Sequence, residues 1–147
     1  MKKQKLNKIK ILSKDRDVPK ILSKDGVELV ITKFENSRIQ NTDNIKKKYG
    51  SKKSWAYRAI NTKSNSATLI SQKPGEGNRV HYHSDWDEWW FILKGKAKFE
   101  INNKTYTVKK GDLVLIERNN IHRITALGKS NCIRIAVSRS DVDHIYV

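Results

Sequence analysis

The most constraining feature of the sequence is the segment from Gly75 to Gly95, which reads GEGNRVHYHSDWDEWWFILKG. It contains two of the four histidines, His81 and His83, with one residue between them. Glu88 follows five positions after the second histidine. Side chains at positions i and i+2 of a strand share a face, so the two imidazoles are expected to point to the same side of a β-strand.

A carboxylate and a third imidazole are expected to join this pair. Glu88 has the opposite strand parity to His83, but residues 84–87 are turn-like and reset the register. Glu88 then enters the interior from the next strand, in step with Trp90. A further histidine lies beyond a Gly-Asp turn and an apolar strand. The sequence thus predicts four residues around one metal ion: His81, His83, Glu88 and His122.

Three imidazoles and one carboxylate suit a divalent ion of iron, manganese, nickel, cobalt or zinc. One such ion is the expected cofactor, with coordination positions left open for substrate or water. The alternative is that the His-x-His pair is solvated or hydrogen-bonded and that Glu88 lies at the surface. His144, in the segment DVDHIYV, has no comparable context and is expected to be structural.

Short apolar runs at nearly even spacing occupy most of the chain. Residues 96–101 and 133–137 alternate between apolar and polar side chains, as strands with one buried face do. Asn102 and Asn103 are expected to form a hairpin turn, because asparagine tolerates the positive φ of tight turns. Further strands are expected at 27–32, 55–60, 67–72, 89–93, 105–108 and 113–116, the last as a buried strand. This pattern predicts an all-β barrel or jelly roll.

A chain of 147 residues fits one domain, which we place at residues 27–147, after an N-terminal arm of residues 1–26. The arm contains the sequence KILSKD at residues 10–15 and again at 20–25, with Pro19 before the second copy. Each copy is expected to form a brief edge strand or a turn, and the arm to pack on a neighbouring subunit. Residues 42–50 are expected to form a short helix or a loop.

Two stretches of the sequence resemble the motifs of the cupin superfamily. The first motif, G-x5-H-x-H-x4-E-x6-G, is matched at every defining position over residues 75–95. The second is matched over residues 111–126 as G-x5-E-x-N-x2-H-x3-A. It keeps the histidine but has Glu117, Asn119 and Ala126 where the family usually has proline, glycine and asparagine.

The resemblance spans residues 66–138 and implies a double-stranded β-helix with a metal near one mouth. It also implies a homodimer, since dimers are common among cupins. Functions within the family are diverse, and include isomerases, epimerases, dioxygenases, decarboxylases, lyases and non-catalytic binding modules.

Composition argues against several other classes. The formal net charge of +16 invites a nucleic-acid partner, but the lysines are scattered and no recognised motif accompanies them, so specific nucleic-acid binding is not expected. No apolar run approaches the ~20 residues that cross a membrane, and the basic N-terminus lacks the apolar segment of a signal peptide.

Cys132 is the single cysteine and is expected to be a packed side chain. A cytoplasmic protein without a membrane partner is expected.

Several side chains near the ligands are candidates for substrate binding. Arg79 is the first, because a guanidinium pairs with carboxylate or phosphate through two parallel hydrogen bonds; the alternative is a salt bridge to Asp85 or Asp87. Trp90 is expected to line the pocket, whereas Trp89 is expected at a core or subunit interface. The acid–base candidates are Tyr57, Lys73 and Tyr106.

The resemblance favours an enzyme that acts on a small polar or anionic metabolite. The motif and the single-domain form lean toward sugar or sugar-phosphate isomerase or epimerase chemistry, in which a metal polarises substrate oxygens. An Fe(II)-dependent dioxygenase would use the same ligand set, and a non-catalytic ligand-binding module is the second alternative. The expected partners are a small-molecule substrate and a second copy of the chain.

Overall fold

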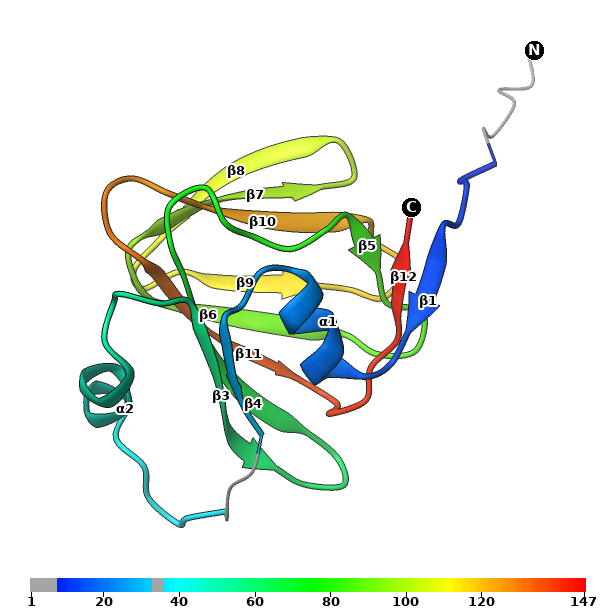
Figure 1. The fold of residues 1–147 in the computed structure, drawn as a ribbon. Coiled ribbons are helices and arrows are strands. Elements are labelled where there is room, and N and C mark those ends of the chain that lie inside the picture. Colours follow the sequence, from blue (N-terminus) through cyan, green and yellow to red (C-terminus); the bar gives the residue numbers. More distant parts are fainter. Residues whose placement is uncertain (1–7, 33–35) are drawn as a thin grey trace.

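Two β-sheets face each other in the computed structural model, which describes residues 8–32 and 36–147 (Figure 1). In spatial order, the first sheet contains β1 (Ser13–Asp15), β12 (His144–Tyr146), β5 (His81–Tyr82), β10 (His122–Leu127), β7 (Lys96–Ile101) and β8 (Lys104–Lys109). The second contains β2 (Leu29–Ile31), β3 (Trp55–Asn61), β4 (Ser66–Gln72), β11 (Cys132–Ser138), β6 (Glu88–Lys94) and β9 (Leu113–Ile116).

The neighbours within both sheets are antiparallel, except that β2 runs parallel to β3. The inward-facing residues of the two sheets form the core. On β6, for example, Glu88, Trp90 and Ile92 are buried and alternate with more exposed neighbours, so the turn before this strand resets the register as expected. This arrangement confirms the predicted all-β double-stranded β-helix.

Asparagine and glycine make the turns that bring the strands together. Asn102 and Asn103 connect β7 to β8 with φ angles of 46° and 66°, which confirms the predicted hairpin turn. Asn119 stands where the cupin pattern usually has glycine and also adopts a positive φ, of 69°. Asparagine enters this region more readily than most residues, so the departure from the motif leaves the turn before β10 intact.

The N-terminal segment differs from the expected arm. The first KILSKD copy ends in β1, an edge strand that pairs with β12 of the same chain; packing of the arm on a neighbouring subunit stays a prediction. The second copy lies mainly in the helix α1 (Val18–Lys24), not in a strand or turn. The sequence before it explains the helix, because Asp17 caps its first turn by accepting a hydrogen bond from the Lys20 backbone N–H. Pro19 fits the first turn, where its missing N–H costs no hydrogen bond.

A second helix, α2 (Thr42–Tyr49), covers part of the outer face of the second sheet. Asn41 caps its N-terminus and Gly50, at a φ of 68°, ends it. Ile45 and Tyr49 of the helix pack on outward-facing side chains of β3, β4 and β11, among them Trp55. The helix alternative for residues 42–50 is therefore the correct one.

Next to α2, the outer face at β6 (Glu88–Lys94) and β9 (Leu113–Ile116) is apolar, and no other part of the described chain covers it. Residues 113–116 were expected to be buried, but only Val114 and Ile116 point inward, while Leu113 is 73% exposed and Leu115 57%. Trp89, on the adjacent strand, is 44% exposed. The reason is that β9 is the outermost strand of its sheet and one of its two faces has no layer packed against it.

Cys132 is buried and unpaired, and burial raises the pKa of its thiol, as expected for a packed side chain. Among the described residues, we find no helix long and apolar enough to cross a membrane.

Gly77 lets the loop before β5 approach β10 closely. A Cβ at this position would lie 1.9 Å from the carbonyl oxygen of Ile124. We expect Gly77→Ala to lower the free energy of unfolding by about 2–3 kcal/mol, because backbone must move to relieve the overlap. Urea denaturation measures the change. Gly75→Ala is the comparison, since it meets open space and adds only left-handed backbone strain; an equal loss in both variants would contradict the close approach.

Candidate metal centre

Three histidines from different parts of the chain meet at the inner face of the first sheet. His81 lies on β5 and His122 begins β10, and the two residues are direct neighbours across the strand pair. His83 follows β5. Each of the three is only 1% exposed, so the fold removes them from water almost completely.

Backbone carbonyls fix the tautomer of these rings. His81 Nδ1 lies 2.7 Å from the carbonyl oxygen of Arg79, and His122 Nδ1 lies 2.8 Å from that of Asn120. His83 Nδ1 contacts the carbonyl oxygen of Asp143. A carbonyl oxygen only accepts hydrogen bonds, so each Nδ1 carries the proton and each Nε2 keeps its lone pair when the ring is neutral. This is the usual arrangement of a metal-binding imidazole.

The three rings are close enough to share one ion. One ligand atom from each of His81, His83 and His122 lies within 4.8 Å of the other two. His122 Nε2 is buried and has no hydrogen-bond partner within the part of the chain described. A buried polar atom without a partner is rare and calls for an explanation. The donor set and this lone pair both fit a divalent metal.

Glu88 completes the group from the second sheet. One of its carboxylate oxygens, Oε2, lies 3.1 Å from His83 Nε2 and 3.9 Å from His122 Nε2. Burial raises the pKa of Glu88, but the hydrogen bond and charge of His83 outweigh burial and lower it to about 2. Conversely, burial lowers the pKa of His83, and the Glu88 carboxylate reverses the shift so that the net change is upward. The carboxylate is therefore ionised at neutral pH.

The N-terminal segment supports His83 through Asp143. This aspartate, whose carbonyl holds His83, is itself buried. Its side chain pairs with Lys14 at 2.9 Å and with Arg16, and it accepts a hydrogen bond from the Ser84 hydroxyl. Burial raises the pKa of Asp143, but these cationic partners lower it overall. Lys14 and Arg16 thus hold the loop that orients one of the three imidazoles.

His144 belongs to the same cluster, although the sequence suggested only a structural role. Its ring stacks on His81 with centroids 4.8 Å apart and meets His83 edge-on at 4.6 Å. Its Nδ1 donates to the Val142 carbonyl oxygen at 3.0 Å. Burial lowers the pKa of His144 to about 4, so the ring is neutral at pH 7. The pairing of β12 with β5 brings it here, and that pairing has no local sequence signal.

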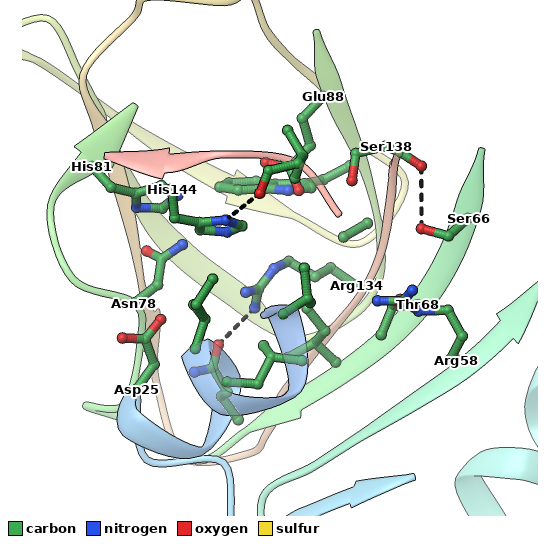
Figure 2. A pocket seen from close by; sticks show the side chains of 18 residues that line it. Asp25, Arg58, Ser66, Thr68, Asn78, His81, Glu88, Arg134, Ser138 and His144 are labelled. Carbon is green, nitrogen blue, oxygen red and sulfur yellow. Dashed lines mark hydrogen bonds between the residues drawn. The ribbon is translucent and has the colours of Figure 1, made fainter. Parts of the chain in front are cut away.

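A small cavity of about 50 Å³ lies beside these rings (Figure 2). Its wall includes His81, Glu88, Trp90 and His144, and α1 closes one side with Val18, Ile21 and Leu22. Polar groups complete it, and Figure 2 labels Asp25, Arg58, Ser66, Thr68, Asn78, Arg134 and Ser138 among them.

Of the two expected substrate-binding residues, only Trp90 lines this cavity. Its ring meets that of His122 at 6.0 Å. Arg79 was expected to line the interior, but its guanidinium donates to Asp25 at 2.5 Å and to the Tyr146 hydroxyl at 2.9 Å. Strand parity fails for Arg79 because β5 begins only at His81. The alternative partners Asp85 and Asp87 are bound by other arginines.

The three acid–base candidates all lie away from the cavity. Tyr57 faces the outer side of the second sheet, where its hydroxyl contacts Gln40. Lys73 pairs with Glu28 at 2.6 Å near the surface. Tyr106 is about half exposed on β8, at the edge of the first sheet. In this geometry, none of the three can reach a ligand bound beside the histidines without rearrangement.

Comparison with known proteins agrees with the fold and with the motifs. Residues 68–138 match a family model described as the cupin domain. The chain contains a cupin domain. A comparison with curated proteins finds no match to this cupin.

Several solved structures resemble this cupin. An uncharacterized conserved protein with a double-stranded β-helix domain from Klebsiella pneumoniae has a TM-score of 0.63 and 18% identity, covering 76% of this chain and 99% of that one. The polyketide cyclase RemF from Streptomyces resistomycificus has a TM-score of 0.57 and 17% identity, covering 67% and 74%. KdgF from Halomonas sp. has a TM-score of 0.53 and 17% identity, covering 56% and 76%. At such low sequence identities, the structural similarity is evidence for the fold only.

The sequence reasoning also missed Arg58 and Arg134 of this cupin. On β11, the alternating residues Ile133 and Ile135 were the visible apolar face, but they point outward toward α2. Arg134 lies between them and therefore points inward. An arginine in the middle of an apolar strand was the signal available in the sequence.

The metal-free cupin should lose stability as the pH falls from 6.5 to 4.5. Burial lowers the folded-state pKa of His122 and of His144 to about 4, below the unfolded value of about 6.5. The unfolded chain thus takes up protons first, and each of these two groups removes about 2 kcal/mol across this window. The pKa of His81 is also lowered, while the raised pKa of His83 opposes the trend.

Urea denaturation of chelator-treated protein at several pH values between 7.5 and 4.5 measures this effect. Staying above pH 4.5 keeps most carboxylates ionised, so the histidines dominate the change. A free energy of unfolding that does not fall across the window would contradict the burial of neutral imidazoles.

Proposed function

We propose that this cupin is a metal-dependent enzyme that acts on a small anionic metabolite. One observation carries the proposal: three buried imidazoles are held at Nδ1 by backbone carbonyls, and one ligand atom from each lies within 4.8 Å of the other two, beside a cavity. A purely structural histidine cluster would gain nothing from leaving His122 Nε2 without a partner among the described residues.

His81, His83 and His122 would hold the metal, with Glu88 as the fourth ligand. A bound divalent ion of iron, manganese, nickel, cobalt or zinc would act as a Lewis acid on substrate oxygens. The protein itself orients the imidazole rings and excludes water from the site. The carbonyl hydrogen bonds keep each ring in one tautomer, and the buried side chains around them exclude water, which strengthens electrostatic interactions in the site.

For the reaction, we favour proton transfer of the isomerase or epimerase type, as the motif stretch suggests. The ionised Glu88 faces two imidazoles and is a poor free base. An Fe(II)-dependent dioxygenase remains the alternative, and oxygen consumption by the iron-loaded protein in the presence of substrate would favour it. A non-catalytic module is favoured instead if ligand affinity is the same with and without metal.

We expect His122→Ala to lose most of its bound metal. Protein purified without chelator or nickel resin should carry about one ion per chain, and the variant only a small fraction of that. Elemental analysis by mass spectrometry gives the ratio. Arg123→Ala is the matched control, because Arg123 is the next residue but pairs with Glu100 rather than facing the histidines. Equal metal content in the two variants would contradict the proposed site.

We also propose that a second copy of the chain covers the exposed apolar face of the second sheet. Strand pairing places six uncharged side chains there in two rows, Ile135–Phe91–Leu113 and Val137–Trp89–Leu115. Large exposed apolar patches mark interaction sites. Because the patch carries no charge, two chains of net charge +16 can meet on it about a twofold axis without bringing lysines together.

We expect the double substitution Trp89→Ser and Leu115→Ser to convert a dimer to a monomer, because it removes apolar area that only a partner would bury. Size-exclusion chromatography with light scattering measures the mass. Tyr106→Ser is the control, since Tyr106 is about as exposed as Trp89 but lies on the other sheet. A monomeric parent protein, or a variant that stays dimeric, would contradict this interface.

A further inference from the structure

Two buried arginines line the cavity beside the histidines, where Figure 2 shows them with His81, Glu88 and His144. Arg58 comes from β3 and Arg134 from β11, with β4 between these strands. The exposed fraction of Arg134 is 3% and that of Arg58 is 8%. Neither arginine is needed to hold the metal ligands in place.

Neither guanidinium is neutralised by the protein. Arg134 donates one hydrogen bond, at 2.7 Å, to the side-chain oxygen of Gln72, and its guanidinium lies 5.2 Å from the centre of the Trp90 ring. The Nε atoms of Arg58 and Arg134 have no hydrogen-bond partner in the described chain. Neither arginine forms an ion pair with any carboxylate among the described residues.

The carboxylates of the cavity wall have other partners. Asp25 accepts a hydrogen bond from Arg79, and Glu88 faces His83 and His122. Two positive charges therefore remain in the wall without a countercharge of their own. The metal ion proposed alongside them would add further positive charge.

This arrangement is costly unless a ligand completes it. A buried donor without an acceptor costs about 1–3 kcal/mol, and an unpaired buried charge costs several more. Arginine stays protonated even in such surroundings. An anion in the cavity would supply both the acceptors and the countercharge, and the planar guanidinium suits the two oxygens of a carboxylate.

We propose that Arg58 and Arg134, with Gln72 hydrogen-bonded to Arg134, form a subsite that binds the carboxylate group of a short-chain organic acid. The subsite rests on the proposed function, because it would lie next to the metal ion proposed there. The size of the cavity sets the ligand class. A water molecule occupies roughly 10–15 Å³ by this measure, so the 50 Å³ cavity takes only a few non-hydrogen atoms. A small hydroxy or oxo acid fits, whereas a whole sugar phosphate does not.

The test uses acetate as the probe and acetamide as its neutral counterpart of equal size. Isothermal titration calorimetry and thermal denaturation are run on the full chain as purified, and again after metal removal with chelator, at constant ionic strength. We expect acetate to bind and to raise the Tm, and acetamide to do neither. Binding that survives chelation belongs to the arginines rather than to the metal.

Four variants locate the binding. Arg58→Met and Arg134→Met should each weaken acetate binding at least about tenfold, and Arg134→Lys should lose less than Arg134→Met because it keeps the charge. Arg123→Met is the matched control: it changes the net charge by the same amount but removes a partly exposed arginine of the first sheet that pairs with Glu100. Because the buried charges are unpaired, Arg134→Met should not lower the Tm in acetate-free buffer.

Three results would overturn the subsite. These are equal binding of acetate and acetamide, an Arg134→Met variant that binds acetate like Arg123→Met, and tighter binding of inorganic phosphate than of acetate. Failure of the proposed metal site can be distinguished from failure of the arginine subsite. A protein that binds acetate through both arginines but carries no metal would retain the subsite and lose the proposed enzyme.

Discussion

The site depends on hydrogen bonds from imidazole Nδ1 atoms to backbone carbonyls. His81, His122 and His144 each make this bond to the residue two positions earlier, and His83 makes it to Asp143. These carbonyls belong to residues just before β5, β10 and β12, so ring orientation is set by the backbone rather than by flexible side chains. The four rings can then pack against one another with their Nε2 atoms free for other partners.

Charge is distributed unevenly around these rings. Glu88 is the anion that faces the histidines, whereas Asp25 and Asp143 are held by cations of the rim and of the N-terminal segment. The interior of the second sheet contributes Arg58 and Arg134 instead. The cavity is therefore basic on one side and rich in neutral imidazole on the other. This separation would orient a ligand with its carboxylate toward the arginines and its hydroxyl or carbonyl oxygen toward the imidazoles.

The sequence predicted the fold well because the signals of the fold are local. Apolar alternation, the Asn102–Asn103 turn and the His-x-His spacing each involve neighbouring residues, and the structure has the strands that they indicate. The turn after His83 also returned Glu88 to the interior at the expected parity. Metal binding by these residues stays a prediction.

The surroundings of the cavity were harder to predict because they depend on pairing between distant strands. His144 reaches the histidines only through the β12–β5 pair. Tyr57 and Arg58 are adjacent, and the choice of which faces inward depends on the layer that covers each side of β3. The helix α2 covers the Tyr57 side, which turns Arg58 inward. Sequence reasoning had no means of placing that helix.

The contact of Lys14 and Arg16 with Asp143 joins segments from opposite ends of the described chain. Contacts of such long sequence separation close large loops and tend to form slowly. The loop that orients His83 is thus expected to reach its native conformation late in folding, after the hairpins of the barrel. An early barrel would have its strands in place and still lack a fully ordered third imidazole, so metal uptake and the final stage of folding would coincide.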